Sequence, residues 1–279
     1  LQLVGQGVKV TRMKSKWLIL FIVFGLILTA CGGGSDDAAE VEEVVAEEPA
    51  ETLDAPATTA AAAEPEADPA SICLVLDIGG LGDLSFNDLA YSGYEKAIAD
   101  FGMEGTFLEP DGGGENRGEL LELCAEAGND LIIGNGFLFD ASMNEVAPNY
   151  PDLNFAITDG VAEPANVRGM LFDHAEGSFL AGVAAALKTT NNHVGFLGGV
   201  DFPLIHEFEQ GFIAGVQAIN PDIVIEIGYA SVAPDFSGFN DVVKGKEIAL
   251  AQYESGADVI YHAAGGTGTG MFEAAKEVS

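Results

Sequence analysis

Short apolar runs alternate with longer segments of helical periodicity from residue 71 to residue 279. Runs that are apolar throughout predict strands buried on both faces, and apolar residues at three- and four-residue spacing predict helices. The predicted strands cover 72–76, 106–108, 131–133, 155–158, 167–172, 193–197, 223–227 and 259–261. The predicted helices cover 86–101, 115–127, 140–147, 176–188, 204–219, 241–254 and 270–278. This alternation favours an α/β fold with parallel sheets covered by helices on both faces.

The first 30 residues follow a different pattern. Lys14 and Lys16 precede an apolar run of 12 residues at 17–28, whereas a membrane-spanning helix needs about 20. A short basic region followed by such a run is typical of an export signal. The run ends in Leu28-Thr29-Ala30-Cys31, which resembles the bacterial lipobox whose cysteine is lipidated. We therefore predict a lipoprotein signal peptide over 1–30, with Met13 as the alternative start and an uncleaved anchor as the alternative role.

Residues 31–70 contain 12 acidic side chains and no basic one. Glycine opens the segment, and alanine, glutamate, proline and threonine fill it. A segment of this composition cannot bury enough apolar surface to fold by itself. We predict an acidic, disordered tether between Cys31 and the folded part.

Charge excludes one class of partner. The chain has 44 acidic side chains against 11 basic ones, a formal net charge of −33. A protein that binds a nucleic-acid polymer needs a basic face, which this balance does not supply.

Cys73 and Cys124 fall on a predicted strand and a predicted helix near it. We expect buried thiols there rather than a disulfide, because both positions suit a small apolar residue.

Glycines, carboxylates and aromatic residues follow the predicted strands. In an open α/β sheet, ligands bind outside the carboxyl ends of the strands. The loops at these ends begin at Asp77, Gly134, Asp159 and His262. We therefore look for the binding site in these loops.

Motifs of the common α/β enzymes do not match. A dinucleotide-binding dehydrogenase needs G-x-G-x-x-G after a strand, and neither the run at 80–85 nor the run at 266–271 has this spacing. The chain also lacks a P-loop and the G-x-S-x-G nucleophile motif. Its four histidines are scattered, without the H-E-x-x-H spacing of a zinc site. We expect neither an enzyme nor a cofactor or metal.

Several loop sequences resemble the basic membrane lipoprotein family. The similar segments, in chain order, are 77–87, 136–139, 174–177 with 180–182, 194–199, 208–212 and 262–268. The resemblance implies a type I periplasmic-binding-protein fold, in which two α/β lobes, here 71–190 and 191–279, close on a cleft like a hinge. It implies a purine nucleoside as ligand (guanosine, inosine or adenosine) and an ABC permease as partner. With acylated Cys31 in the lipid bilayer, the protein would face the extracytoplasmic side.

The resemblance and the strand-end positions together suggest the ligand contacts. Phe86 and Phe208 would stack on the two faces of a base, and aromatic stacking of a base contributes about 1–3 kcal/mol. Asp77 and Asp159 would accept hydrogen bonds from N–H groups of the base. Asn87 offers both a donor and an acceptor, and Gly136 and Phe137 are further candidates from a loop. Backbone N–H groups of Gly265, Gly266 and Thr267 would bind ribose hydroxyls.

Each candidate also has a structural alternative, as a core, capping or close-packing residue. Two further functions stay open at this point: a receptor of the same fold for a sugar or autoinducer, and a ligand sensor.

In type I folds the chain returns to the first lobe near its end. Because residue 279 follows a helix of the second lobe, we expect the C-terminal part of the fold to be missing from this chain.

Overall fold

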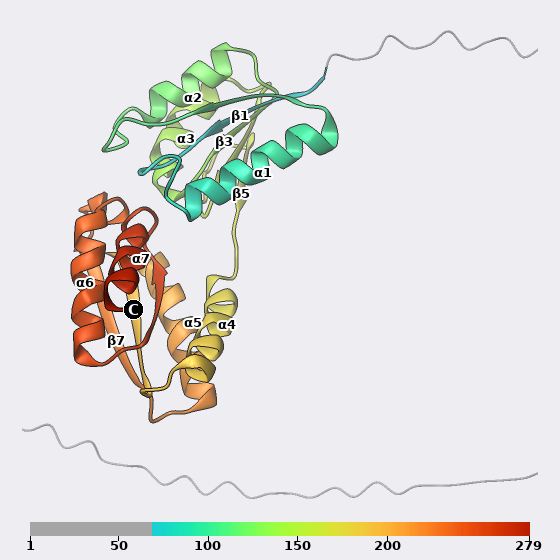
Figure 1. Cartoon of the computed structure of the whole chain (residues 1–279). Helices are drawn as coiled ribbons and strands as arrows, with labels where there is room; N and C mark the ends of the chain where they lie inside the picture. The colour runs from blue at the N-terminus through green and yellow to red at the C-terminus, as the bar shows by residue number, and fades with distance from the viewer. Residues whose placement is uncertain (1–68) are drawn as a thin grey trace, which may run out of the picture. The chain divides into compact units, whose positions relative to one another are not determined.

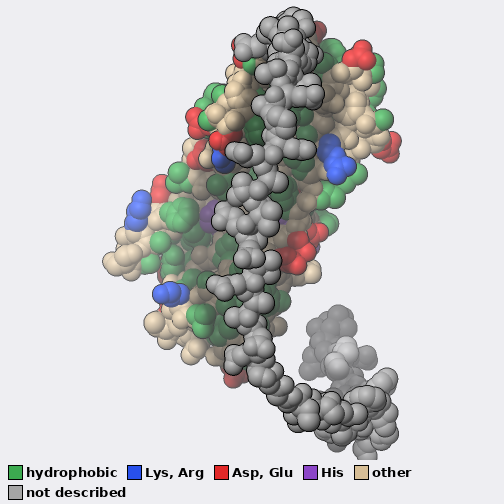
Figure 2. All heavy atoms as spheres, turned by 90° about the vertical axis from the view of Figure 1, so that its right-hand side faces the viewer, with side chains coloured by type: hydrophobic (Ala, Val, Ile, Leu, Met, Phe, Trp, Pro, Cys, Tyr) green, Lys and Arg blue, Asp and Glu red, His purple; other side chains and the backbone are tan. Residues whose placement is uncertain are grey.

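The computed structural model describes residues 69–279, coloured in Figure 1. The predicted signal peptide, Cys31 and nearly all of the predicted tether lie outside the described residues. Within 69–279, no helix combines the length and the apolar character needed to cross a membrane. On the face drawn in Figure 2, Lys and Arg side chains lie singly among acidic and apolar ones.

The first lobe is built on a five-stranded parallel sheet, with strand order β2-β1-β3-β4-β5. The strands are β1 (Ser71–Val75), β2 (Glu104–Leu108), β3 (Leu131–Gly134), β4 (Asn154–Thr158) and β5 (Val167–Met170). The connecting helices are α1 (Phe86–Phe101), α2 (Arg117–Glu126) and α3 (Asp140–Val146), with short turns η1 (Phe137–Phe139) and η2 (Ala147–Asn149).

Side chains of β1 alternate between two apolar clusters. Cys73 and Val75 join residues of α2 and α3 on one face. Ile72 and Leu74 join Tyr94 of α1 on the other. The sheet is therefore covered on both faces, which explains why the strand sequence is apolar throughout.

The second lobe is built on a three-stranded parallel sheet, with strand order β7-β6-β8. The strands are β6 (His193–Asp201), β7 (Val224–Val232) and β8 (Val259–Ala263). The helices are α4 (His174–Lys188), α5 (Pro203–Ile219), α6 (Val242–Ser255) and α7 (Thr267–Val278), with the turn η3 (Phe236–Phe239). Helices α4 and α5 pack together beside the sheet, as do α6 and α7 on its other side (Figure 1).

Helix α4 lies with the second lobe, whereas the predicted boundary at residue 190 assigned it to the first. Ala185 of α4 is buried in the same cluster as Val194 and Phe212. A Cβ on Gly182 would lie 2.1 Å from the carbonyl oxygen of Phe212, so glycine allows α4 to approach α5 this closely. The chain therefore crosses between lobes at residues 171–173, before α4.

Every predicted strand and helix between residues 71 and 279 is present, and the differences are at the ends. Strands β6 and β7 run further than predicted, to Asp201 and Val232. Helix α4 begins two residues early, because Asp173 accepts a hydrogen bond from Glu176 N and caps it. Helix α7 begins at Thr267, inside a run whose glycines had indicated a loop.

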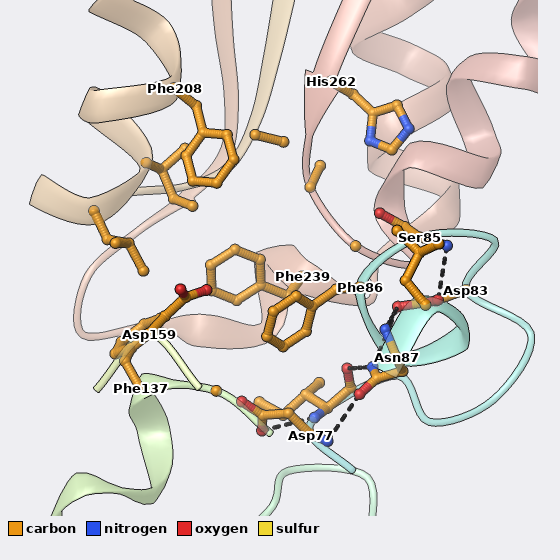
Figure 3. Close-up of a pocket in the computed structure, with 18 of the residues that line it drawn as sticks. Asp77, Asp83, Ser85, Phe86, Asn87, Phe137, Asp159, Phe208, Phe239 and His262 are labelled. Carbon is orange, nitrogen blue, oxygen red and sulfur yellow. Dashed lines mark hydrogen bonds between the residues drawn. The ribbon is translucent and has the colours of Figure 1, made fainter. Parts of the chain in front are cut away.

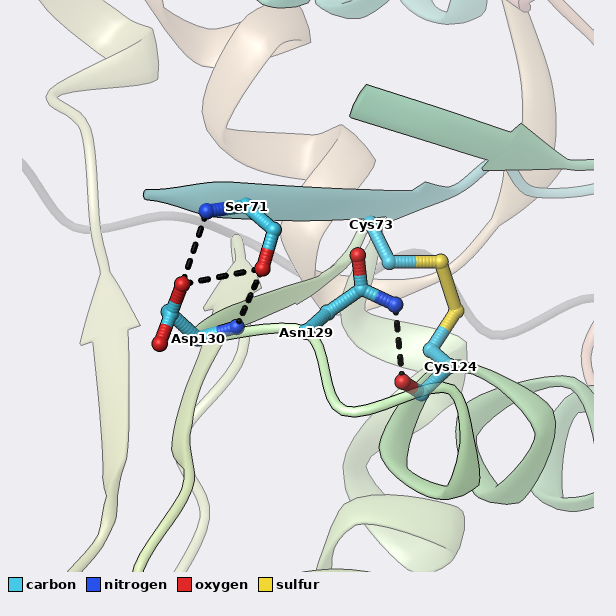
Figure 4. Close-up of a disulfide and its surroundings, with 5 residues drawn as sticks. All are labelled: Ser71, Cys73, Cys124, Asn129 and Asp130. Carbon is cyan, nitrogen blue, oxygen red and sulfur yellow. Dashed lines mark hydrogen bonds between the residues drawn. A yellow bond between two sulfur atoms is a disulfide. The ribbon is translucent and has the colours of Figure 1, made fainter. Parts of the chain in front are cut away.

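Cys73 and Cys124 form a disulfide, which joins β1 to α2 (Figure 4). Their Cα atoms are 5.8 Å apart, within the usual range for a disulfide. The expectation of two buried thiols was wrong. Both side chains are buried as expected, but the packing of α2 against β1 directs one sulfur at the other.

Candidate ligand-binding site

A cavity of about 280 Å³ lies at the carboxyl ends of the strands, where both lobes contribute side chains. Figure 3 shows the rings of Phe86, Phe208 and Phe239 around it, with Asp77 and Asp159 nearby. A volume of this size suits one small ligand. The cavity is lined by Asp77, Ile78, Asp83, Ser85, Phe86, Asn87, Leu89, Gly136, Phe137, Asp159, Leu204, Ile205, Phe208, Phe239, Tyr261, His262, Ala263, Ala264 and Gly265.

Eight of the ten predicted contact residues line this cavity; Gly266 and Thr267 do not. Thr267 is fully buried. Its hydroxyl donates to Gly238 O and accepts from Asp241 N, both at 2.7 Å, and its N–H donates to Ala264 O. Thr267 therefore joins the start of α7 to the segment before α6. We correct its predicted role as a ribose-binding donor.

Hydrogen bonds to two carboxylates shape the loop between β1 and α1. Asp83 accepts from the N–H groups of Ser85, Asn87 and Asp88, and so caps the start of α1. Asp88 accepts from Gly82 N and Leu84 N. The loop needs glycine at residues 79, 80 and 82, where φ is +100°, +58° and +94°. This local geometry places Phe86 at the first turn of α1, facing the cavity.

The amide of Asn87 is engaged by the protein itself. Its Oδ1 accepts from Asp77 N at 2.9 Å and from Asn135 Nδ2 at 3.3 Å. Its Nδ2 donates to Ile78 O and to Asp83 Oδ2, each at 3.2 Å. These four bonds use both donors and both acceptor sites of the amide. Asn87 therefore holds the ends of β1 and β3 together, which favours its structural alternative over direct ligand contact.

The two oxygens of the buried Asp77 carboxylate differ in their hydrogen bonds. Oδ1 accepts from Ile78 N at 2.8 Å and from the guanidinium of Arg117, whose Nε lies at 3.0 Å. Oδ2 accepts no hydrogen bond within residues 69–279, and it lies beside Gly136, where a Cβ would come within 2.6 Å of it. Burial raises the pKa of Asp77, and the charge and hydrogen bonds of Arg117 act in the opposite direction.

Asp159 lies at the end of β4 with a φ of +57°, which is uncommon for a residue other than glycine. Its Oδ1 is 3.1 Å from His174 Nε2, an ion-pair distance without hydrogen-bond geometry. Burial raises the pKa of Asp159, His174 opposes that shift, and Glu207 adds to it. The imidazole of His174 also stacks on Phe208, with ring centroids 4.5 Å apart. His174 thus links a carboxylate of the first lobe to an aromatic ring of the second.

Aromatic rings from both lobes meet beside the cavity. Phe137 of η1 stacks on Phe202, with centroids 5.0 Å apart and planes inclined by 13°. It also contacts Phe236 and Phe239 of η3 edge-on, at 5.8 and 6.4 Å. Such pairs contribute about 0.5–1.5 kcal/mol beyond burial. Phe137 therefore holds the lobes together as well as lining the cavity.

Sequence reasoning missed several lining residues, most clearly Phe239, Tyr261 and His262. Tyr261 and His262 stand in the last predicted strand and the loop after it, so the rule of strand ends could have found them. Phe239 lies in an irregular turn that no periodicity marks.

Burial lowers the pKa of His262, and the charge of Asp83 partly offsets this shift. No group of side chains within residues 69–279 is arranged to hold a metal ion.

Residues 71–279 match the family described as ABC transporter substrate-binding protein, PnrA-like. The chain belongs to this family. A protein of Lactococcus lactis named ABC transporter nucleoside-binding protein BmpA is 36% identical over 214 residues, which are 74% of this chain and 58% of that protein. The CD4+ T-cell-stimulating antigen of Listeria monocytogenes is 36% identical over 267 residues, 94% of this chain and 67% of that protein. The resemblance inferred from the sequence is thereby confirmed.

A solved structure described as an ABC transporter solute-binding protein of Aeropyrum pernix matches with a TM-score of 0.66 and 32% identity. The match covers 75% of this chain and 59% of that one. A sugar transporter from Clostridium phytofermentans is 16% identical with a TM-score of 0.53, which shows a shared fold alone. These matches confirm the predicted type I periplasmic-binding-protein fold. The chain spans about three fifths to two thirds of the length of the relatives and of the Aeropyrum chain.

Proposed function

We propose that this protein is the substrate-binding component of an ABC importer and binds a purine nucleoside in the cavity between its lobes. The observation that carries the proposal is that aromatic rings of both lobes and carboxylates of the first lobe converge on one cavity. Rings suit the faces of a base, and carboxylates suit its N–H groups. The name of the Lactococcus relative supports the same ligand class.

Charge favours a nucleoside over a nucleotide. No Lys or Arg is among the residues that line the cavity, whereas Asp77, Asp83 and Asp159 are. A phosphate group would enter an acidic cavity without a cation to meet it, and that is unfavourable in a partly desolvated site. A ligand without phosphate has no such cost.

The proposed contacts use residues of both lobes. Phe86 stacks on one face of the base and Phe208 on the other. Oδ2 of Asp77 and the carboxylate of Asp159 accept from the base, and the backbone at Gly265 faces the sugar. Gly136 leaves room beside Asp77, and Phe137 closes the side of the cavity. Closure of the lobes buries the ligand, and the closed form docks on the permease without any chemical step.

Isothermal titration calorimetry of the full chain tests the ligand class. We expect binding of guanosine, inosine or adenosine, and no measurable heat from ribose or from guanosine 5′-monophosphate. The monophosphate is the matched control, because it differs from guanosine only by the phosphate. Binding of ribose or a hexose without any nucleoside would instead identify a sugar receptor.

The membrane anchor is a separate part of the proposal. We infer that the signal peptide over 1–30 directs export, that Cys31 is acylated, and that the protein stays at the extracytoplasmic side of the membrane. A relative from Pyrococcus abyssi, 32% identical over 218 residues, is described as a lipoprotein. Metabolic labelling with palmitate tests the anchor: label should appear on the wild type and disappear in Cys31→Ser. Label that survives this substitution would contradict it.

A further inference from the structure

We propose that Arg117 is a positioning residue for the ligand: its guanidinium holds Asp77 ionised and oriented, so that Oδ2 is available to accept from the base. This inference rests on the proposed nucleoside function. Arg117 itself does not line the cavity. It acts through Asp77, on the side of the carboxylate away from the ligand.

The first argument is geometric. Arg117 Nε and Nη2 both donate to Asp77 Oδ1, and Ile78 N donates to the same oxygen. Three donors on Oδ1 fix the plane of the carboxylate and leave Oδ2 as its free acceptor. Figure 3 shows Asp77 at the edge of the cavity, with Oδ1 bonded to the backbone. A carboxylate held on one side in this way is pre-organised for a donor on the other.

The second argument is that Arg117 is itself held in place. Its Nη1 donates to Gly114 O at 2.8 Å, and its guanidinium lies 5.5 Å from the centroid of the buried ring of Phe139. A Cβ on Gly114 would come within 2.4 Å of Arg117 Cζ, so only glycine leaves room here. The side chains of Arg117 and Asp77 are 11% and 10% exposed. Such a buried, bonded guanidinium supplies a permanent positive charge.

The third argument concerns ionisation. Burial alone would favour the neutral form of Asp77 and raise its pKa, and Arg117 is the charged group that counters this. Of the other titratable groups around the cavity, Asp83 has both oxygens bonded to the start of α1, Asp159 is paired with His174, and His262 has a lowered pKa. A protonated Asp77 would present a donor where an N–H of the base needs an acceptor.

The experiment measures guanosine affinity of the full chain by calorimetry, for the wild type and three variants, between about pH 8 and about pH 5.5. Arg117→Gln removes the charge and the two-pronged contact with Asp77. Arg117→Lys keeps the charge without the two-pronged contact. Arg168→Gln is the matched control, because it removes a positive charge from an exposed arginine on β5 of the same lobe.

We expect Arg117→Gln to weaken guanosine binding about tenfold near neutral pH, since charged hydrogen bonds orient the acceptor. The loss should grow as the pH falls, because the pKa of Asp77 rises without its cation. Arg117→Lys should restore part of the affinity and most of the wild-type pH profile, and Arg168→Gln should match the wild type. In an Asp77→Asn background, Arg117→Gln should change affinity by less than about twofold, because the two residues act as one unit.

Three results would overturn the inference: a folded Arg117→Gln variant with wild-type affinity, a pH profile parallel to that of the wild type, or an equal loss with and without Asp77. Thermal unfolding establishes whether each variant is folded. If Arg117→Gln does not fold, Arg117→Lys decides the question. An Arg117→Lys affinity equal to that of the wild type at every pH would show that the two-pronged contact does not position Asp77. Wild-type protein that binds no nucleoside would instead refute the proposed function, and this inference with it.

Discussion

The two lobes contain the same helix–turn–strand unit, at residues 124–134 and 252–262. In each, a glycine with positive φ follows the end of the helix, Gly128 at +78° and Gly256 at +117°. The N–H of that glycine donates to Ala125 O in the first lobe and to Tyr253 O in the second, at 3.0 and 3.1 Å. An aspartate follows two residues later in each lobe and precedes the strand that pairs with the lobe's first strand. The first three strands of both sheets accordingly have the same order.

The lobes differ in how the helix is attached to the sheet. Cys124 of the first lobe corresponds in position to Gln252 of the second, and Cys73 corresponds to Gly195. The first pair is a disulfide. In the second lobe, Gln252 Nε2 donates to Phe196 O at 2.9 Å and to Glu226 O at 3.4 Å, and a Cβ on Gly195 would come within 2.5 Å of its Oε1. One contact in the fold is thus made by a covalent bond in one lobe and by a buried amide in the other.

The fold therefore requires a contact between the helix and the first strand at this point, and either a disulfide or a buried amide can supply it. A disulfide stabilises chiefly by restricting the unfolded chain, whereas an amide stabilises by satisfying backbone carbonyls in the folded state. The two lobes should therefore respond differently to reductant and to polar substitutions.

Reduction of the disulfide should have the largest effect. The cysteines are separated by 51 residues, and closing a loop of that size contributes about 4 kcal/mol in the chain-entropy model. We expect reductant to lower the urea midpoint of unfolding, and hydrogen exchange to show loss of protection in β1 while β6 keeps more of its protection. A Cys73→Ala/Cys124→Ala variant should be insensitive to reductant. An unchanged wild-type midpoint would mean that the bond does not stabilise the first lobe.

Replacing Gln252 should be the corresponding perturbation of the second lobe. Gln252→Leu removes two hydrogen bonds to backbone carbonyls and leaves those carbonyls buried, at a cost of about 2–3 kcal/mol. Urea unfolding should report the loss, and it should persist in reductant. Gln217→Leu, at an exposed position of α5, is the matched control and should leave stability within about 0.5 kcal/mol of the wild type. Equal midpoints for the two variants would refute the role of the amide.

The two lobes should also contribute one aromatic face each to the ligand. Phe86→Ala and Phe208→Ala should each weaken nucleoside binding about tenfold, the equivalent of about 1.4 kcal/mol of stacking. Phe101→Ala serves as a control, because Phe101 ends α1 and is 78% exposed. Calorimetry with guanosine measures all three. If only Phe86→Ala weakened binding, the stack would belong to the first lobe alone.

Substitution of the aspartates in the shared unit should change the stability of the protein least. Asp130 accepts hydrogen bonds from the backbone and side chain of Ser71 (Figure 4), and Asp258 accepts from Thr190 N, Thr190 Oγ1 and Asn191 N. Desolvation raises the pKa of Asp258, but these bonds and one from Thr189 outweigh it, and the pKa falls to about 2. Bonds from Ser71 likewise lower the pKa of Asp130.

A lowered folded-state pKa means that the ionised aspartate stabilises the folded protein above the unfolded-state pKa of about 4, and that this is lost as the pH falls towards 2. Asp258→Asn should therefore reduce stability at neutral pH by at most about 1 kcal/mol, given solvent screening, and should flatten the decline in stability below about pH 4. Acid unfolding followed by circular dichroism measures this. A decline as steep as in the wild type would show that Asp258 does not contribute.

Most of the secondary structure, and eight of the nineteen residues that line the cavity, could be predicted from the sequence. Buried parallel strands are apolar on both faces, so runs such as 72–76 stand out, and the residues after them must gather at one edge. Asp77, Phe86 and Asp159 were found in this way. Phe239 was not, because its turn has no period. The N–H of Thr267 was assigned to the ligand because the sequence does not show that it is buried and donates to Ala264 O.

The order of strands and helices, the loops that carry the site and the family of the chain all follow from the sequence alone. Local burial leaves a periodic pattern along the chain, which marks the strands and helices, and the loop motifs that follow the strands carry the family resemblance. The three-dimensional structure was needed to show that Cys73 is bonded to Cys124, that α4 packs with the second lobe, and that Arg117 bonds to Asp77. Each of these is a contact between segments far apart in the chain, and its existence depends on distances and directions that periodicity does not record.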